Sequence, residues 1–213
     1  GEATANIQLC TAHWYGGNRE QSCENTVKSV KKLLGGIQID GYYELNMSEI
    51  PKLNSMVDGV TVTLEDDFSK KYPKMKKGAT INLDDEQAYA YVHDRYGVGD
   101  EENTSRMKRQ QQYMTGFFKK LQEKVKANPN YANEVFESLQ DVSTTDITIG
   151  KISNISNIFA SGTDKGIFQL AGKSKIGQAL GDEMDHMEFY VNKKAMVSTM
   201  SELFGIVEQK NKE

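Results

Sequence analysis

The chain has little of several features that mark well-known protein classes. Its 213 residues contain two cysteines and three histidines, without the spaced pairs that bind structural zinc. No run of apolar residues is long enough to span a membrane, and Gly1 begins no signal peptide. Positive charge is not in excess, because the net charge is -4, and this argues against a general nucleic-acid-binding protein.

The composition that remains is that of a globular protein. Apolar residues make up 38% of the chain and charged residues 26%, which are ordinary shares for a folded domain. The length is sufficient for one sizeable domain with a buried core. We therefore expect residues 1–213 to form a single domain.

The two cysteines, Cys10 and Cys23, flank a glycine turn in "LCTAHWYGGNREQSC". One interpretation is two buried thiols in a cytosolic protein. The other is a disulfide that closes a short loop in an exported protein, which would stabilise the fold by roughly 3 kcal/mol in the loop-entropy model. We favour the disulfide.

Helical and extended patterns alternate along the chain. Apolar residues recur at helical spacing in the segments 23–34, 48–57, 84–95, 103–125, 145–159 and 193–207. Short runs of β-branched or aromatic residues predict strands at 42–46, 59–64, 166–172 and 187–191. The lysine-rich segment 65–79 reads as a surface connection. This alternation favours an α/β fold with a mixed central sheet covered by helices on both faces, a three-layer α-β-α arrangement.

Details of these helices can be predicted from their residues. Ser48 has the right side chain to cap the second helix, and Pro51 is tolerated in its first turn. The buried residues of three helices follow from periodicity. They are Ala88, Tyr91 and Val92 in segment 84–95, Met107, Met114, Leu121 and Val125 in segment 103–125, and Ile152, Ile155 and Ile158 in segment 145–159.

The segment 92–114, "VHDRYGVGDEENTSRMKRQQQYM", gathers the candidate functional residues. Arg95 ends one helix and Arg106 lies in the first turn of the next. Free backbone N–H groups at a helix start attract anions, and two guanidinium groups add donors suited to phosphate or pyrophosphate. Gln110 lies one turn beyond Arg106 and can orient a bound oxygen. The alternative is a solvated helix start with intrahelical ion pairs.

This segment resembles the signature of the LytR-CpsA-Psr family. In that family an R-x-R pair, an acidic turn and an R-x-x-R-Q-Q helix follow an "LxGxxALxYxR" segment, which here is "INLDDEQAYAYVHDR". The resemblance continues in "TAHWYGG" and "IDGYYELN" before the motif, and in "TTDITIGKISNISNIF" and "MEFYVNKKAMVSTMSELF" after it. It covers nearly all of the chain.

The resemblance implies a phosphotransferase of the cell envelope. Family members move a glycopolymer, such as wall teichoic acid or capsular polysaccharide, from a polyprenyl-pyrophosphate carrier onto peptidoglycan. The resemblance also implies an extracellular domain of a Gram-positive bacterium, held by a membrane anchor upstream of this chain, and Mg²⁺ as cofactor. The alternative is a non-catalytic module of the same fold that binds polyprenyl-phosphate lipids or lipid-linked glycopolymer.

The motif also implies roles for individual residues. Arg95 corresponds to the second arginine of R-x-R, and Arg106, Arg109 and Gln110 correspond to R-x-x-R-Q. These four residues would bind the pyrophosphate. Arg95, Arg106 and Asp100 are the implied catalytic residues, with Asp100 positioning an arginine or helping to activate the acceptor hydroxyl.

The chain departs from the family pattern at three places. His93 stands where the first arginine of R-x-R usually lies, and Asn103 stands where many members have aspartate. The "SDT" and "PRD"-like segments, whose aspartates bind Mg²⁺ in the family, do not precede the "AHWYGG" region. We therefore assign no metal ligand within this chain.

Overall fold

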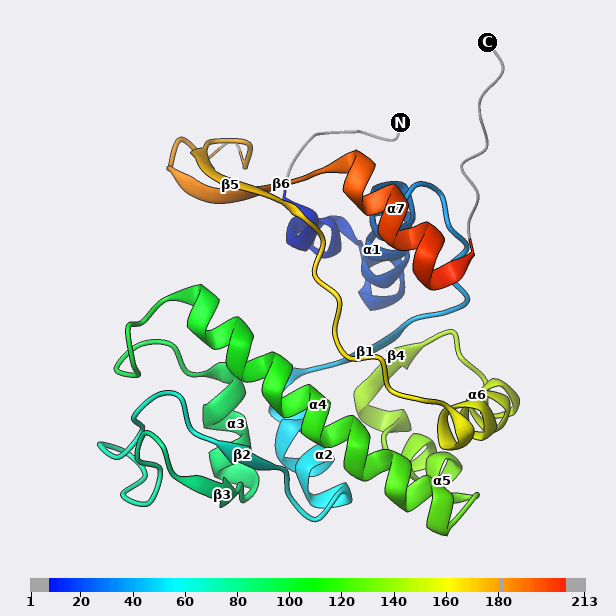
Figure 1. Ribbon diagram of the computed structural model, residues 1–213. Coiled ribbons are helices and arrows are strands. Elements are labelled where there is room, and N and C mark those ends of the chain that lie inside the picture. The colour runs from blue at the N-terminus through cyan, green and yellow to red at the C-terminus, as the bar shows by residue number, and fades with distance from the viewer. Residues whose placement is uncertain (1–7, 181, 206–213) are drawn as a thin grey trace. The chain divides into compact units, whose positions relative to one another are not determined.

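The computed structural model describes residues 8–180 and 182–205. Contacts divide the chain into two compact units, and Figure 1 shows the elements of each. One unit contains residues up to 42, residues 144–146 and residues from 168 onward, and the other contains 43–143 and 147–167. We describe each unit by itself.

The unit of residues 43–143 and 147–167, which we call the central unit, is built on α4, a helix of 25 residues. Its elements are, in order, β1 (Tyr43–Leu45), η2 (Met47–Glu49), α2 (Ile50–Met56), β2 (Thr61–Thr63), β3 (Thr80–Asn82), α3 (Asp85–His93), α4 (Asn103–Ala127), α5 (Tyr131–Ser138), η3 (Gln140–Val142) and α6 (Ile149–Ser161). Strand β4 (Ser143–Thr145) has only Ser143 in this unit. Helix α3 and strand β2 pack against α4, and α5 and α6 pack near its C-terminal end (Figure 1).

The core of this unit lies between α4, α3 and the β2–β3 pair. Its fully buried side chains include Val60, Val62, Leu64, Leu83 and Tyr91. The predicted inward residues of α3 are confirmed, because Ala88, Tyr91 and Val92 are all buried.

The connection 65–79 also contributes to this core. Phe68 and Met75 are buried, and the Phe68 amide donates to the Met75 carbonyl at 2.9 Å. The prediction of a simple surface connection was therefore wrong. Its lysines lie in solvent, but two apolar side chains between them anchor the loop.

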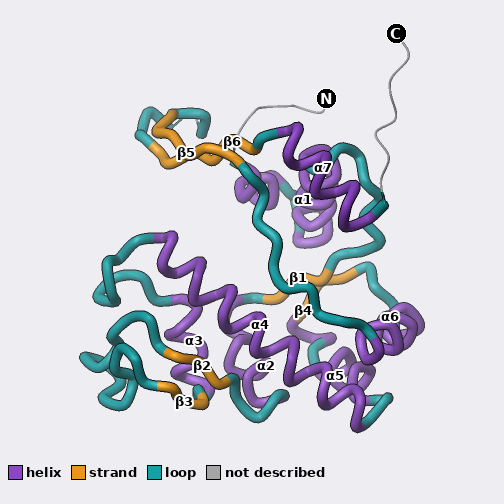
Figure 2. The backbone as a smooth tube through the Cα atoms, viewed as in Figure 1, coloured by secondary structure: helices purple, strands orange, loops and turns teal. Residues whose placement is uncertain are grey.

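The predicted three-layer sheet is the main correction to the fold. The described residues form a mixed α/β structure that is mostly helical, with three two-stranded sheets, β1–β4, β2–β3 and β5–β6 (Figure 2). In β2, Thr61 and Thr63 are exposed and only Val62 is buried. A central sheet covered on both faces needs strands that are apolar on both sides, and these short segments are not.

The second unit holds the two ends of the described chain. Its elements are η1 (Leu9–Tyr15), α1 (Arg19–Leu33), β5 (Gly172–Gly177), β6 (His186–Val191) and α7 (Lys193–Phe204). Helix α1 begins before the predicted segment 23–34, because the Asn18 side chain accepts a hydrogen bond from the Gln21 amide at 2.9 Å. It ends at Leu33, one residue before the end of the predicted segment, and the chain turns away through Gly35 and Gly36, which have φ values of 78° and 89°.

The closing part of the chain confirms two predictions and corrects one. The predicted strand 187–191 and helix 193–207 correspond to β6 and α7, although residues 206 and 207 lie outside the described residues. The predicted strand 166–172 is wrong. Pairing begins only at Gly172, which lies opposite Val191.

The predicted disulfide is absent from the structure, and Cys10 and Cys23 are not joined. Cys10 is exposed in η1, where its thiol donates to the Gln8 side chain at 3.6 Å, whereas Cys23 is buried on α1. A disulfide requires the two side chains to point toward one another at close range. One thiol in solvent and one in the interior do not meet this condition.

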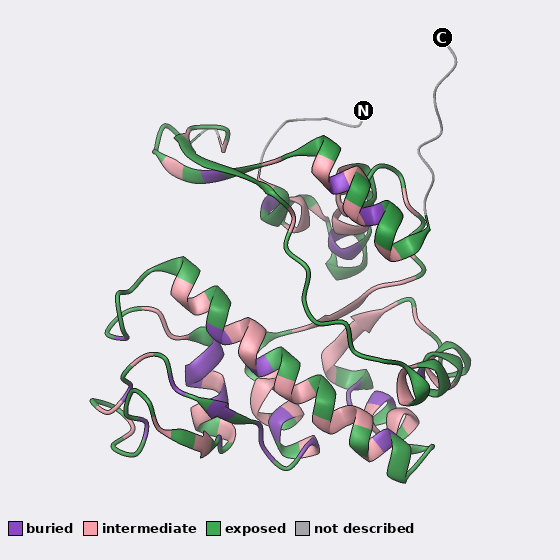
Figure 3. Ribbon diagram, viewed as in Figure 1, coloured by how far each residue is buried: buried purple, intermediate pink, exposed green. Residues whose placement is uncertain are grey.

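Helix α4 exposes part of the face that periodicity assigns to the core (Figure 3). Met107 and Met114 are 47% and 46% exposed, whereas Tyr113 and Val125 are buried. Phe117 is partly buried and packs on the core cluster. The predicted stripe was therefore wrong in its N-terminal half and correct at Val125.

Helices α2 and α6 correct two smaller predictions. Ser48 lies in η2 rather than capping α2, although Pro51 does occupy the first turn of that helix. In α6, Ile155 and Ile158 are exposed, and the fully buried residue is Ser156.

Among the described residues, no helix is both long enough and apolar enough to cross a membrane.

Candidate anion-binding site

The candidate site lies where α3 ends and α4 begins. Asp84 and Gln87 form a reciprocal capping box at the start of α3. The Gln87 amide donates to the Asp84 carboxylate at 2.9 Å, and the Asp84 amide donates to the Gln87 side-chain oxygen at 3.2 Å. The chain then turns through Gly97 and Gly99, whose φ values are 75° and 54°. These left-handed conformations favour glycine and let the chain reverse into α4.

The two predicted site arginines at this turn each have an unsatisfied nitrogen. Arg95 and Arg106 are half-buried, and the Nε atom of each is inaccessible to solvent and has no hydrogen-bond partner in the described structure. Their terminal nitrogens contact near neighbours. Arg95 Nη2 donates to the Tyr96 hydroxyl, and Arg106 Nη2 donates to the Asn103 side chain at 2.7 Å.

Arg109 is bonded quite differently. Its side chain is 2% exposed, and every guanidinium nitrogen donates to the protein. Nε donates to the Tyr91 carbonyl at 2.9 Å, Nη2 to the Asp94 carbonyl, and Nη1 to the Asp66 carboxylate. The guanidinium also lies over the Phe68 ring, with its carbon 5.3 Å from the ring centre.

Asp100 organises the start of α4. Its two carboxylate oxygens accept hydrogen bonds from the Glu102 amide at 2.9 Å and the Ser105 hydroxyl at 2.8 Å. These two bonds stabilise the ionised form and lower the pKa of Asp100 below its usual value. A carboxylate with a lowered pKa is a weak proton acceptor, but it is a stable anchor for the turn.

Two glutamines of α4, one in the motif and one just after it, bond the neighbouring elements. Gln110 Nε2 donates to the Val92 carbonyl at 3.0 Å. The side-chain amide has two N–H groups, and this bond uses one of them. Gln112 Nε2 donates to the Thr63 carbonyl at 3.1 Å, and its oxygen accepts from the Tyr91 hydroxyl. Burial raises the pKa of Tyr91, so this hydroxyl remains a donor.

The predicted site residues thus occupy one short region of the chain, but with different partners. Arg109 and Gln110 both bond the last turn of α3 or the residue that follows it. No contact joins Arg95 to Arg106, so their convergence on one pyrophosphate stays a prediction. His93 is exposed beside Asp94, with Nδ1 3.1 Å from the carboxylate.

Sequence reasoning missed Asp66 as part of this region. A buried arginine requires a nearby anion or several acceptors, and Asp66 supplies the carboxylate from the loop after β2. The sequence offers only a run of three acidic residues, Glu65, Asp66 and Asp67, in a polar loop. Nothing in that pattern separates the half-buried residue from its exposed neighbours.

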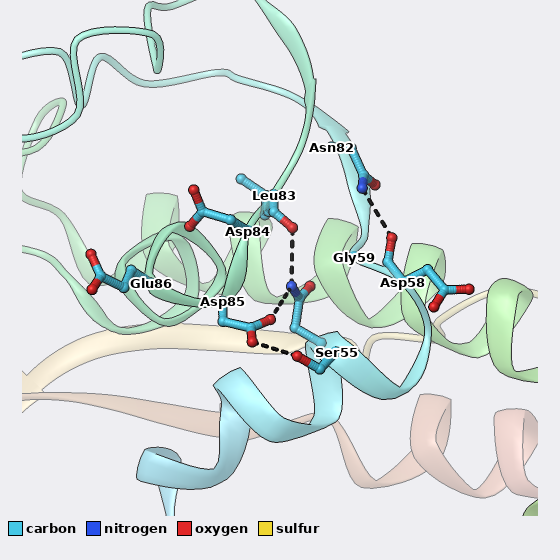
Figure 4. Close-up of a pocket in the computed structure, with 9 residues that line it drawn as sticks. Ser55, Asp58, Gly59, Asn82, Leu83, Asp84, Asp85 and Glu86 are labelled. Carbon is cyan, nitrogen blue, oxygen red and sulfur yellow. Dashed lines mark hydrogen bonds between the residues drawn. The ribbon is translucent and has the colours of Figure 1, made fainter.

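A concave region of about 540 Å³ lies at the other end of α3, away from the predicted site residues. Figure 4 shows its lining, which includes four carboxylates, Asp58, Asp84, Asp85 and Glu86. Such a negative lining would repel a pyrophosphate. The Asp85 carboxylate is also bonded to two side chains of α2.

The expected Mg²⁺ finds no suitable set of ligands among the described residues of the central unit. Mg²⁺ prefers carboxylates in octahedral geometry. No three acidic, histidine or cysteine side chains within these described residues come together closely enough to hold an ion. The two carboxylates nearest the turn already bond the protein, since Asp100 accepts from the start of α4 and Asp66 accepts from Arg109.

The model of the LytR_cpsA_psr family matches residues 2–204. A search of curated proteins gave no match.

Solved structures share the fold at low sequence identity. Lin1025 from Listeria innocua is 20% identical, with a TM-score of 0.67 over 94% of this chain and 79% of that chain. B. subtilis TagU is 19% identical, with a TM-score of 0.58 over 97% and 79%. TagT bound to LI-WTA is 19% identical, with a TM-score of 0.64 over 92% and 69%.

Proposed function

The chain belongs to the LytR_cpsA_psr family, and from this premise we propose that it is a phosphotransferase of the cell envelope. It attaches a glycopolymer, of the wall teichoic acid or capsular polysaccharide type, to peptidoglycan. The donor is a polyprenyl-pyrophosphate carrier and the acceptor is a sugar hydroxyl. The domain works at the extracellular face of the membrane, where an anchor upstream of this chain holds it.

One observation carries the proposal: Arg95 and Arg106 each have a buried Nε without a partner, on the two sides of the turn that starts α4. An unpaired buried donor costs free energy, and an anion that accepts from it removes that cost. A pyrophosphate also benefits from the free N–H groups at the start of α4. TagT, a protein of similar fold, binds LI-WTA, which agrees with a lipid-linked donor.

The chemistry assigned to these residues is charge stabilisation. The acceptor hydroxyl attacks the phosphorus atom that carries the glycopolymer and loses its proton to water, while the bond from that phosphorus to the polyprenyl-phosphate leaving group breaks. Arg95 and Arg106 neutralise the negative charge that gathers on the leaving phosphate. Gln110 donates its remaining N–H to a phosphoryl oxygen, and Asp100 fixes the turn that presents Arg106.

Mg²⁺ enters no step of this mechanism. The family is known to use Mg²⁺, which would neutralise phosphate charge, but the described residues of the central unit do not fit such an ion.

The second candidate function is a non-catalytic module that binds polyprenyl-phosphate lipids or lipid-linked glycopolymer. The observation that favours it is the bonding of Asp100, whose oxygens are occupied and whose pKa is lowered. A module without a strong base at this turn can still hold the pyrophosphate through its arginines.

Binding of a short-chain isoprenoid pyrophosphate, measured by isothermal titration, tests what the two functions share. Arg106→Ala should weaken binding by roughly 1.5–3 kcal/mol, the scale of a charge-assisted hydrogen bond. Arg106→Lys should recover part of this loss, because lysine keeps the charge without the planar fork. Lys108→Ala is the matched control, since Lys108 is exposed on the same helix. Equal affinity of Arg106→Ala and the parent would contradict both functions.

A transfer assay then separates the two functions. The purified chain is incubated with a lipid-linked glycopolymer and peptidoglycan, and the linked product is measured with and without Mg²⁺. Product that depends on Arg106 supports the transferase. Tight binding without product under both conditions supports the binding module.

A further inference from the structure

Arg109 connects α4, on which it lies, with the end of α3 and with the loop that follows β2. It bonds the last turn of α3 through the Tyr91 carbonyl and the residue after α3 through the Asp94 carbonyl. Its third partner is Asp66, in the loop that follows β2. With the guanidinium buried and each nitrogen bonded, Arg109 fixes the point where α3 ends and the turn begins.

Asp66 also lies directly against that turn from the other side. A Cβ atom built on Gly99 would be 2.4 Å from Asp66 Oδ1, far closer than any real contact. Gly99 therefore allows the turn to lie on the carboxylate. The turn between Asp94 and Asp100 is thus held at its first residue by Arg109 and near its end by the Asp66 carboxylate.

We infer that Asp66 is a positioning residue, which acts through Arg109 to set the turn that carries Arg95 and leads to Arg106. The inference rests on the proposed function for its ligand, the pyrophosphate group. It divides the arginines of the motif into two kinds. Arg95 and Arg106 have donors left for a ligand, whereas Arg109 holds the protein in the conformation that presents them.

The first test replaces the charge of Asp66 with minimal change in shape. In Asp66→Asn, the Arg109 guanidinium loses its anionic partner, so the turn should open more often. Hydrogen exchange of the amides of residues 95–102 should become faster, while exchange in β2 should stay as in the parent. Affinity for the isoprenoid pyrophosphate should fall on the order of tenfold, because a misplaced contact group loses much of its effect.

The matched control for this variant is Asp67→Asn. Asp67 is the next residue in the same loop, but it is exposed and accepts hydrogen bonds from the Ser69 amide, at 2.7 Å, the Ser69 hydroxyl and the Lys77 amide, not from Arg109. This variant should exchange and bind as the parent does. If the two variants changed exchange and affinity equally, the cause would be the lost negative charge of the loop and not the contact with Arg109, and the inference would be overturned.

A second pair of variants changes the turn residue that lies against Asp66, namely Gly99, and a control glycine in the same turn. Gly99→Ala adds a methyl group against Asp66, whereas Gly97→Ala adds one where nothing lies within 4 Å. Both substitutions strain a left-handed residue, so the difference between them reports the contact with Asp66. Gly99→Ala should lose more affinity and exchange faster in residues 95–102. This pair remains informative if Asp66→Asn fails to fold.

A double variant distinguishes positioning from general loss of structure. If Asp66 acts by placing Arg106, then Arg106→Ala should cost less affinity in Asp66→Asn than in the parent. Independent, additive losses would overturn the inference, as would parent-like exchange of residues 95–102 in folded Asp66→Asn.

Failure of the proposed function gives a different pattern. If the parent does not bind the isoprenoid pyrophosphate, the function is wrong, and the exchange measurements decide alone whether Asp66 positions the turn.

Discussion

Replacement of Asn54 should test how the central unit is held together. Asn54 lies on α2, is 1% exposed, and uses all of its hydrogen-bonding atoms. Its Nδ2 donates to the Leu83 carbonyl at 3.0 Å and to Asp85 at 2.9 Å. Its Oδ1 accepts from the Val60 amide and the Tyr113 hydroxyl, both at 3.2 Å. One side chain therefore connects α2 with β2, the start of α3, and α4.

The expected loss follows from these bonds. Asn54→Ala leaves three buried groups without their partner, namely the Val60 N–H, the Leu83 carbonyl and the Tyr113 hydroxyl. An unsatisfied buried group costs roughly 1–3 kcal/mol, and water entering the new space recovers part of it. We expect the free energy of unfolding to fall by about 3–5 kcal/mol.

Asn54→Asp sharpens the same prediction. It keeps the size and the accepting oxygen but replaces the donor by a second oxygen, which faces the Leu83 carbonyl and the Asp85 carboxylate. Two carboxylates at this distance repel each other, so the variant should be least stable at neutral pH and recover at acidic pH as one of them is protonated.

The measurement is urea unfolding followed by circular dichroism, with hydrogen exchange to locate the loss in α2 and α3. Asn154→Ala, at an exposed position of α6, is the control and should change stability little. A loss below about 1 kcal/mol for Asn54→Ala would refute the reasoning, because it would mean that the buried groups find other partners.

Two further predictions concern α4. In the same unfolding assay, Tyr113→Ala should lower the free energy of unfolding by about 3–5 kcal/mol, and Met114→Asp should lower it by less than about 1 kcal/mol. The reason is that Tyr113 is buried and Met114 is exposed. The reverse order would contradict the observed buried face of the helix. The pKa of Asp100, followed by carboxyl NMR, should lie below the ordinary value of 3.8 and rise in Ser105→Ala. Since a lowered folded-state pKa contributes stability above the unfolded pKa, this contribution should be lost as the pH falls through the folded value. An Asp100 pKa at or above the ordinary value would contradict the observed bonds.

Helix α3 shows what local sequence determines. Its polar start, "DDEQ", forms a capping box, and its apolar residues recur at helical spacing, so both the helix and its buried face were predictable. These features depend on residues within one or two turns of each other.

The face of α4 shows where periodicity fails. Counting only apolar residues selects Met107 and Met114, which are exposed. The buried face instead includes Arg109 and Tyr113, one helical turn apart. A charged residue counts as exposed in any hydrophobic pattern, and its burial depends on Asp66, 43 residues earlier in the chain. The sequence contains no local signal for such a pair.

The predicted central sheet failed for a related reason. Strand segments can be recognised from residues such as those of "GVTVTL", but their partners cannot. Val62 pairs with Ile81 in the structure, and the outer face of this pair carries threonines and an asparagine that bond one another. With a polar outer face, the pair packs on the helices from one side only.

The sequence motif R-x-x-R predicts one role for Arg106 and Arg109, whose hydrogen bonding differs in the structure. Residues three apart on a helix are offset by about 60° around its axis, and here Arg106 is half-buried and Arg109 is buried. Burial of Arg109 is stable because each nitrogen has an acceptor, whereas Arg106 keeps an inaccessible Nε without one. A satisfied arginine gains nothing from a ligand, and an unsatisfied one does. An anion that accepts from Arg106 therefore removes a cost that the ligand-free turn carries, and it stabilises the folded chain by the same interaction that binds it.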